Sequence, residues 1–383
     1  MQARAVARRE RRNAVVFGAV FALASCGPAA PLRSAAVSEP LPALAPEPIG
    51  TTVVLVTIDG ARREEVFRGV DGVLGRGHGL RESELLDARA LVPSLHALTV
   101  AYGAAFGAPE LGGEIRASGP NFVSLPGYTE LLTGRWPSSC ADNACGAVRE
   151  PTLIDDLAAR FGCSPGAAAV LTSWPDIGRV AAQRPDCTTM SSGRHGGFHL
   201  ERLRPLPADA ARFEADGRAD PFPGHGDFRP DHLTGAQALA YLERYEPRFL
   251  FLGLGETDEY AHRGDYRGYL SALSEADRWV GAIARALDRL AERGRRTALF
   301  VTADHGRAKS FADHGAAYPE SAEIWLIAAG TAITARGVPS REGPRRLADV
   351  TPTARRLLGL EPDHSARAGT ALAEIIAAAP SRL

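Results

Sequence analysis

Apolar runs rich in β-branched residues alternate along the chain with segments of helical hydrophobic periodicity. The clearest run, residues 52–58 (TVVLVTI), is typical of a strand buried on both faces. Similar runs occur at residues 168–172, 249–254, 298–302 and 324–328, and helical patterns occur at residues 152–161, 233–246, 266–292 and 348–358. This alternation predicts an α/β fold with a central, largely parallel sheet flanked by helices on both faces.

The alternating pattern extends over residues 50–375, which we interpret as one large domain. Within it, residues 188–232 are dense in Gly, Pro, His and Arg and show no periodicity. We therefore expect an irregular insertion at about residues 188–232.

The first 25 residues have the layout of an export signal. Five arginines and a single glutamate in residues 1–12 precede a short apolar run at residues 14–24, which is too short to span a bilayer. The run ends in Leu23-Ala24-Ser25-Cys26, which resembles the lipobox of bacterial lipoproteins. We expect residues 1–25 to be a lipoprotein signal peptide and Cys26 to carry a lipid anchor on a bacterial membrane. The protein would then be periplasmic or at the cell surface. An ordinary signal peptide with an incidental Cys26 is the alternative.

Residues 26–49 are rich in Ala, Pro and Ser without periodicity, as a flexible tether is. The whole chain of 383 residues has 44 Lys+Arg against 45 Asp+Glu and a net charge of −1. Loss of five arginines and one glutamate with the signal changes the net charge to −5. An acidic body argues against a nucleic-acid polymer as partner, and the sequence leaves the oligomeric state open.

Four cysteines remain after Cys26, an even number that suggests disulfides in an exported chain. Three pairings are possible, of which Cys140–Cys145 with Cys163–Cys187 is the simplest. A zinc site is less favoured, because no two of the four are spaced as Cys-x-x-Cys.

Polar residues with metal-ligating side chains follow three of the expected strands. Asp59 follows the first, Asp258 and His262 follow the run at residues 249–254, and Asp304-His305 follow the run at residues 298–302. His314 lies nine residues beyond His305. The carboxyl ends of parallel strands meet at one edge of a sheet, where active sites gather. Carboxylates and imidazoles without thiolates suit zinc or a similar divalent ion, and these residues are enough for two ions.

A nucleophile is expected near this edge. Ser124 begins a short helical stretch with Pro126 in its first turn and Gly134 at its end. Free backbone N–H groups at a helix start would stabilise a phosphate near this hydroxyl. The alternative is that Ser124 only caps the helix.

The ordered set of motifs resembles the alkaline phosphatase superfamily, especially its nucleotide pyrophosphatase/phosphodiesterase-like and sulfatase-like branches. It consists of Asp59-Gly60, Ser124-Leu125-Pro126, Asp258-x-x-x-His262, Asp304-His305-Gly306 and His314-Gly315. The resemblance covers about residues 50–362.

The resemblance implies two divalent metal ions, with zinc favoured. One would be held by Asp258, His262 and His314, and the other by Asp59, Asp304 and His305. Ser124 would face the pair, ligate metal and act as the nucleophile, and a bound metal would lower the pKa of its hydroxyl.

The expected function is therefore metal-dependent hydrolysis of small phosphate mono- or diesters, which makes the protein a metallophosphohydrolase. The family often places a substrate-binding asparagine about 20 residues after the nucleophile, and Asn143 is 19 residues beyond Ser124. Gly127-Tyr128 after Pro126 leaves the sulfatase modification signal incomplete. A sulfatase-like hydrolase or phosphoryl transferase is therefore the second hypothesis, and an inactive metal-binding lipoprotein is the third.

Overall fold

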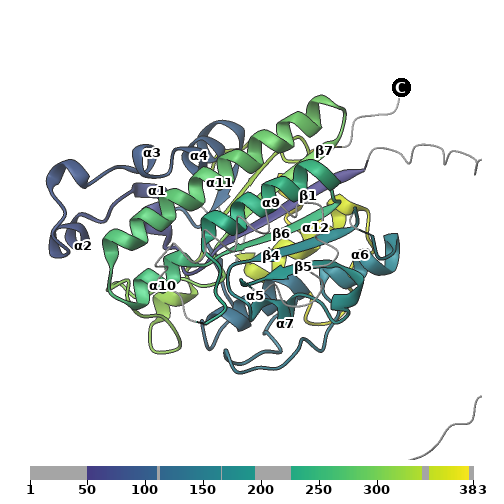
Figure 1. Ribbon diagram of the computed structural model, residues 1–383, viewed down its shortest axis with the longest axis horizontal. Helices are drawn as coiled ribbons and strands as arrows, with labels where there is room; N and C mark the ends of the chain where they lie inside the picture. Colours follow the sequence, from purple (N-terminus) through teal and green to yellow (C-terminus); the bar gives the residue numbers. More distant parts are fainter. Residues whose placement is uncertain (1–49, 110–112, 165, 195–225, 339–344, 379–383) are drawn as a thin grey trace, which may run out of the picture. The chain divides into compact units, whose positions relative to one another are not determined.

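The central sheet of this computed structural model has the strand order β2-β8-β7-β1-β6-β4-β5 (Figure 1). The structure describes residues 50–109, 113–164, 166–194, 226–338 and 345–378. Its strands are β1 (Thr51–Ile58), β2 (Gly103–Phe106), β4 (Ala168–Thr172), β5 (Thr189–Ser192), β6 (Phe249–Leu254), β7 (Arg296–Thr302) and β8 (Leu326–Ala329). Neighbouring strands are parallel except at β8, which is antiparallel to both β7 and β2. A separate pair joins β3 (Ile115–Arg116) to β9 (Arg345–Arg346).

Helices cover both faces of the sheet (Figure 1). One face carries α5 (Ser124–Thr133), α6 (Leu153–Phe161), α7 (Ile177–Ala181) and α12 (Val350–Leu358). The other carries α1 (Arg63–Arg68), α3 (Ala88–Leu91), α4 (Pro93–Ala97), α9 (Asp231–Tyr245), α10 (Glu256–His262) and α11 (Tyr266–Glu292). The short α2 (Gly72–Gly77) lies between α1 and α3 in the chain.

Alternation of side chains along β1 divides the core between the two faces. Val53 and Leu55 pack with the α5 and α12 side, whereas Val54 and Val56 pack with the α11 side. All four are at most 1% exposed. Because both faces are buried, β1 consists of apolar and β-branched residues, and this is why its sequence lacks a polar alternation.

The predicted fold class is confirmed. The helix expected at residues 266–292 is α11 with the same bounds, and the other expected helices agree within two residues at each end. The largely parallel sheet is also present, although the strand expected at residues 324–328 is the antiparallel β8, Leu326–Ala329.

The interpretation of residues 188–232 as irregular is wrong at both ends of the segment. Thr189–Ser192 form the edge strand β5, and α9 begins at Asp231. A strand of sequence TMSS lacks the apolar run that marks a buried strand, so its sequence carried no signal. Residues 195–225 lie outside the described residues.

A compact unit extends over Pro46–Leu383. The predicted signal peptide, Cys26 and the whole of the predicted tether lie outside the described residues. Among the described helices, none combines the length and apolarity that crossing a membrane requires.

Candidate functional site

The strand register brings the predicted ligands to one edge of the sheet. β1 lies between β6 and β7, with Ile58 opposite Leu254 and Thr57 opposite Thr302. All three strands are parallel, so the residues after them, Asp59, the start of α10, and Asp304-His305, emerge side by side. The backbone N–H of Asp59 donates to the carbonyl of Leu254 at 2.9 Å, which joins two of these strand ends directly.

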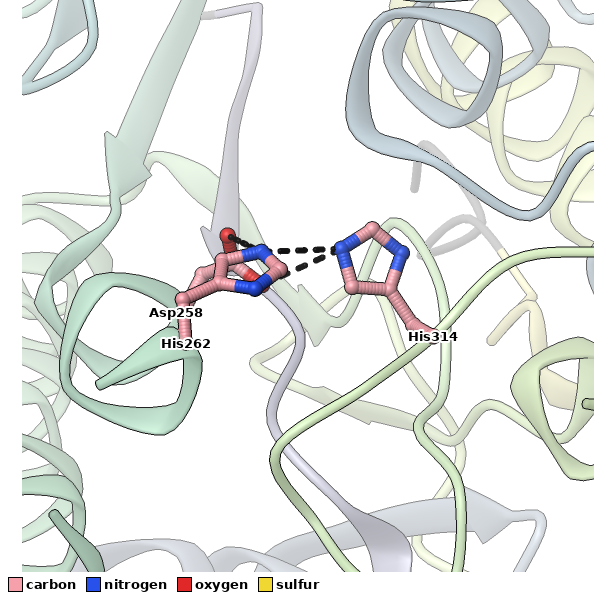
Figure 2. Close-up of side chains that lie close together, drawn as sticks. All are labelled: Asp258, His262 and His314. Atoms are coloured by element: carbon pink, nitrogen blue, oxygen red, sulfur yellow. Dashed lines mark hydrogen bonds and ion pairs between the residues drawn. The ribbon is translucent and has the colours of Figure 1, made fainter. Parts of the chain in front are cut away.

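Asp258, His262 and His314 form the first cluster with metal-ligand geometry (Figure 2). The spacing of four residues puts Asp258 and His262 on the same face of α10, where His262 Nε2 lies 3.1 Å from Asp258 Oδ2. His314 reaches them from the loop after β7, and its Nε2 lies 3.1 Å from His262 Nε2. One ligand atom from each residue lies within 4.8 Å of the others.

Asp59 and His305 form the second cluster, which also includes Asp258. His305 Nε2 lies 3.5 Å from Asp59 Oδ1 and 3.4 Å from Asp304 Oδ2. Both carboxylate oxygens are buried and have no hydrogen-bond partner. Because a buried carboxylate oxygen without a partner is costly, this pair marks a place for a cation.

The histidine tautomers inferred from hydrogen bonding fit metal coordination. His305 Nδ1 lies 2.9 Å from the carbonyl of Gly306, and His314 Nδ1 lies 2.8 Å from the carbonyl of Phe122. A carbonyl only accepts, so each Nδ1 carries the proton and each Nε2 keeps its lone pair. Metal-ligating histidines commonly bond a carbonyl in this way. The donor set of imidazole nitrogens and carboxylate oxygens therefore fits a divalent ion such as zinc.

Burial and mutual repulsion shift the pKa values of these groups in the absence of a cation. Burial raises the pKa of Asp304 to about 7, and burial followed by repulsion from Asp304 and Asp258 raises that of Asp59 well above its ordinary value. Burial lowers the pKa of His305 to about 4 and that of His314 to about 3. The His305 and His314 imidazoles are thus neutral and ready to ligate, whereas the Asp59 and Asp304 carboxylates need a cation to be ionised together. The pKa of His262 is instead raised, chiefly by its contact with Asp258.

Ser124 is the first residue of α5, and Val123 occupies the N-cap position. Its hydroxyl therefore has a different role from capping, and its Oγ lies 3.3 Å from His305 Nε2. Gly127 allows this approach, because a Cβ there would lie 2.4 Å from the carbonyl oxygen of Asp304. Ser124 is 4% exposed and faces the second cluster.

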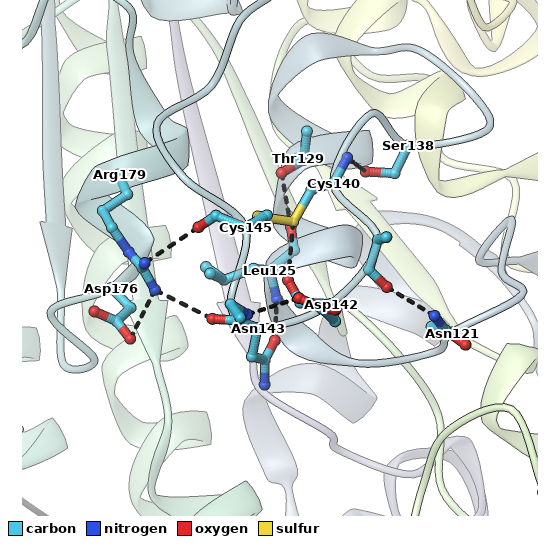
Figure 3. The surroundings of a disulfide bond; sticks show 12 residues. Asn121, Leu125, Thr129, Ser138, Cys140, Asp142, Asn143, Cys145, Asp176 and Arg179 are labelled. Atoms are coloured by element: carbon cyan, nitrogen blue, oxygen red, sulfur yellow. Dashed lines mark hydrogen bonds and ion pairs between the residues drawn. A yellow bond between two sulfur atoms is a disulfide. The ribbon is translucent and has the colours of Figure 1, made fainter.

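Asn143 lies beside the start of α5, held by the loop that the Cys140–Cys145 disulfide closes (Figure 3). Its Oδ1 accepts a hydrogen bond from the backbone N–H of Leu125 at 2.9 Å. Arg179 donates to the carbonyl oxygens of Asn143 and Cys145 at 3.2 and 3.1 Å. With Oδ1 engaged, the amide Nδ2 is the group left to donate to a substrate oxygen.

Both disulfides of the simplest predicted pairing, Cys140–Cys145 and Cys163–Cys187, are present. The structure thus selects one of the three pairings that the sequence left open.

Two residues at the site were missed by sequence reasoning. Tyr128 donates its buried hydroxyl to Asp59 Oδ2 at 2.9 Å. Arg307 donates to Asp258 Oδ1 from a fully buried side chain. Their positions carried a weak signal, because Tyr128 lies one helical turn after Ser124 and Arg307 directly follows Asp304-His305-Gly306.

The structure combines an α/β fold with two clusters of metal-ligating side chains at one edge of the sheet. Residues 229–362, about a third of the chain, match the family model described as "Metalloenzyme superfamily". The matched segment contains Asp258, His262, Asp304, His305 and His314. The predicted resemblance to the alkaline phosphatase superfamily is confirmed.

Curated relatives match part of the chain. The chain is 29% identical over 187 residues to the 2,3-bisphosphoglycerate-independent phosphoglycerate mutase of Chloroflexus aurantiacus, covering 43% of this chain and 33% of that protein. The mutase of Cereibacter sphaeroides is 33% identical over 135 residues, covering 34% of this chain and 23% of its own length. The match thus covers a third or less of these relatives.

Two solved structures share the fold. Wild-type alkaline phosphatase PafA has a TM-score of 0.56 at 12% identity, covering 88% of this chain and 100% of its own. A putative sulfatase from Bacteroides thetaiotaomicron has a TM-score of 0.55 at 14% identity, covering 84% of this chain and 73% of its own. At these identities the likeness concerns the fold.

Proposed function

We propose that the protein hydrolyses small phosphate mono- or diesters in a metal-dependent reaction with Ser124 as the nucleophile. The observation that carries the proposal is the convergence of orphaned carboxylate oxygens and imidazole lone pairs next to the Ser124 hydroxyl. Such a site matches an oxygen-rich divalent pair beside an activated hydroxyl.

Asp258, His262 and His314 would hold one ion, and Asp59, Asp304 and His305 the other, with zinc as the favoured metal. When bound, the ions would lower the pKa of the Ser124 hydroxyl and neutralise charge on the phosphoryl oxygens.

Ser124 Oγ forms a bond to phosphorus while the bond from phosphorus to the leaving oxygen breaks. Water then replaces the Ser124 oxygen on phosphorus, which releases phosphate or a monoester and returns the hydroxyl. Ser124 Oγ lies 3.3 Å from His305 Nε2, so an ion held by that nitrogen would lie next to the attacking oxygen. Asn143 Nδ2 donates to a non-bridging oxygen, because its Oδ1 is already used by Leu125. Positioning and electrostatics supply most of the rate acceleration in phosphoryl transfer.

A phosphoryl transferase on the same site is the second candidate. It is favoured by the curated mutase relatives, which align over 187 residues. The two reactions share the Ser124 step and differ in the acceptor, which is water in one case and a substrate hydroxyl in the other.

Hydrolysis of p-nitrophenyl phosphate, bis-p-nitrophenyl phosphate and p-nitrophenyl sulfate, with and without EDTA, tests the proposal. We expect activity on a phosphate ester that EDTA abolishes and added zinc restores. Ser124→Ala should remove it. Ser274→Ala is the control, because it removes a hydroxyl on α11 that donates to the carbonyl of Leu91. Preference for the sulfate would favour the sulfatase-like alternative, and full turnover by Ser124→Ala would refute the mechanism.

The predicted export and lipid anchor remain part of the proposal. Mass spectrometry of the mature N-terminus from cells should find lipid on Cys26. An unmodified Cys26, or cleavage at another position, would refute the anchor without affecting the catalytic proposal.

A further inference from the structure

Arg307 occupies an unusual position for a cationic side chain, because it contacts a predicted metal ligand from inside the protein. Its side chain is fully buried, and Nη1 donates to Asp258 Oδ1. Its Nε donates to the carbonyl of Phe311, and its Nη2 donates to the carbonyl of Ala312 at 2.8 Å. The three directions of the guanidinium fork are therefore all used within the protein.

These contacts join two separate elements of the first cluster. Asp258 belongs to α10, whereas Phe311 and Ala312 belong to the loop that carries His314 two residues later. Further backbone bonds close this loop, from Phe311 to Ala308 at 2.9 Å and from Ala308 to Asp313 at 2.8 Å. Arg307 thus hydrogen-bonds both to α10 and to the loop that carries His314.

Phe311 shows that the loop is held in place by its surroundings. It has a left-handed φ of 63°, which residues other than glycine rarely adopt. Its buried ring packs edge-on against Tyr266 at 5.0 Å between ring centroids, which keeps the residue in this conformation. The strained backbone directs the Phe311 carbonyl to Arg307 Nε.

Charge and geometry make opposite predictions for Arg307. A positive charge next to a cation site repels the cation, so loss of Arg307 would strengthen metal binding if charge alone mattered. If the fork positions Asp258 and the His314 loop, its loss would weaken metal binding. The contacts to two neutral carbonyl groups favour the second effect, because a residue acting by charge alone has no need of them.

We propose that Arg307 is a positioning residue that holds Asp258 and the His314 loop in metal-ligating geometry. This inference rests on the proposed function, since it requires that the cluster binds a metal ion.

A cavity next to Arg307 makes a chemical-rescue experiment possible. The cavity has a volume of about 420 Å³, and Arg307 shares its walls with Arg62, Lys309 and Glu320. Lys309 is 88% exposed, so the cavity reaches solvent on that side. In Arg307→Ala the space of the lost side chain joins this cavity, and a small guanidinium ion can enter it and reach Asp258.

The experiment measures the zinc affinity of the full chain by competition with a chromophoric chelator. Arg307→Lys keeps the charge without the fork, and Arg307→Met removes both. We expect each to lower zinc affinity 10- to 100-fold, as loss of a partner that orients a metal ligand does. Methylguanidinium should restore part of the affinity of Arg307→Ala, and methylammonium should not. Arg355→Lys is the matched control, because Arg355 is a buried arginine of α12 that pairs with Asp156 of α6.

The inference would be overturned by wild-type or tighter zinc binding by Arg307→Met, by wild-type binding by Arg307→Lys, or by equal rescue by both ions. An Arg307 variant that does not fold by itself is refolded with methylguanidinium, and its refolding yield and zinc binding are measured. If methylguanidinium restores neither of them, the inference is also overturned. Failure of the proposed metal site is distinct, because the wild-type chain would then bind no zinc, and failure of the proposed hydrolysis alone would leave the zinc-affinity test intact.

Discussion

Replacing Tyr128 by phenylalanine tests how much of the second cluster depends on the helix that carries the nucleophile. The Tyr128 hydroxyl donates to Asp59 Oδ2 at 2.9 Å, and the residue is fully buried. Since this bond occupies one carboxylate oxygen, the orphaned Oδ1 is the one directed to His305. Phenylalanine keeps the ring and its packing and removes only the hydroxyl.

The size of the effect follows from the hydrogen bond that is lost. A bond to a charged group contributes about 1.5–3 kcal/mol, and no water can easily replace it at a fully buried position. At about 1.4 kcal/mol per factor of ten, Tyr128→Phe should weaken metal binding at the Asp59 cluster by about 10- to 150-fold. The pKa of Asp59 should also rise further, because the Tyr128 bond lowers it.

The assay is zinc affinity by chelator competition, together with kcat/KM on the best chromogenic phosphate ester. Tyr241→Phe is the control, because it removes a buried hydroxyl that donates to Thr189 at 2.9 Å. Both variants should lose some stability towards urea, and only Tyr128→Phe should lose metal affinity. Equal zinc affinity in wild type and Tyr128→Phe would refute the reasoning.

Three further predictions concern pH, packing and the disulfide loop. The raised pKa values of Asp304 and Asp59 mean that chelator-treated protein keeps these groups protonated after the unfolded chain has lost its protons. The contribution of these two carboxyls to stability should therefore fall as the pH rises from about 4 to about 7, whereas the lowered pKa values of His305 and His314 act in the opposite direction. Chelator-treated Asp304→Asn, which has no proton to lose at this position, should lose less stability than the wild type between pH 5 and pH 8, and an equal change in urea unfolding would contradict this. Gly127→Ala should lower kcat by at least about tenfold, because its Cβ would lie 2.4 Å from the carbonyl oxygen of Asp304; unchanged kinetics would disprove the close approach. Replacing Cys140 and Cys145 together by serine should raise KM several-fold more than it lowers kcat, since the loop holds Asn143, and Michaelis profiles measure this.

Local sequence was sufficient for elements whose neighbours are buried in a regular way. The run at residues 52–58 is β-branched and apolar because β1 has parallel partners and helices on both sides. The amphipathic period of α11 extends through all 27 of its residues, so both of its ends were predicted. Short strands at the sheet edges, β2 (GAAF) and β5 (TMSS), were not predicted, because their pairing with β8 and β4 decides their conformation.

Asp59 and Asp304-His305 were found from sequence because they follow strands, and Asp258 because it lies in the first turn of α10. His262 and His314 were found from their residue type and their spacing from these residues. Their grouping depends on the sheet. Asp258 approaches both clusters, although the resemblance assigned it to one, because α10 begins where β6 lies beside β1.

The sequence by itself determined which side chains can ligate a metal, where the main strands and helices lie, and which serine begins a helix. These are local properties of residue type, apolar period and capping. Only the tertiary structure decided how Tyr128 meets Asp59 and how Arg307 meets Asp258, 69 and 49 residues away along the chain. Such contacts depend on the order of strands in the sheet and on how closely helices pack against it. No pattern within a single segment of the sequence predicts the strand order or the closeness of the helix packing.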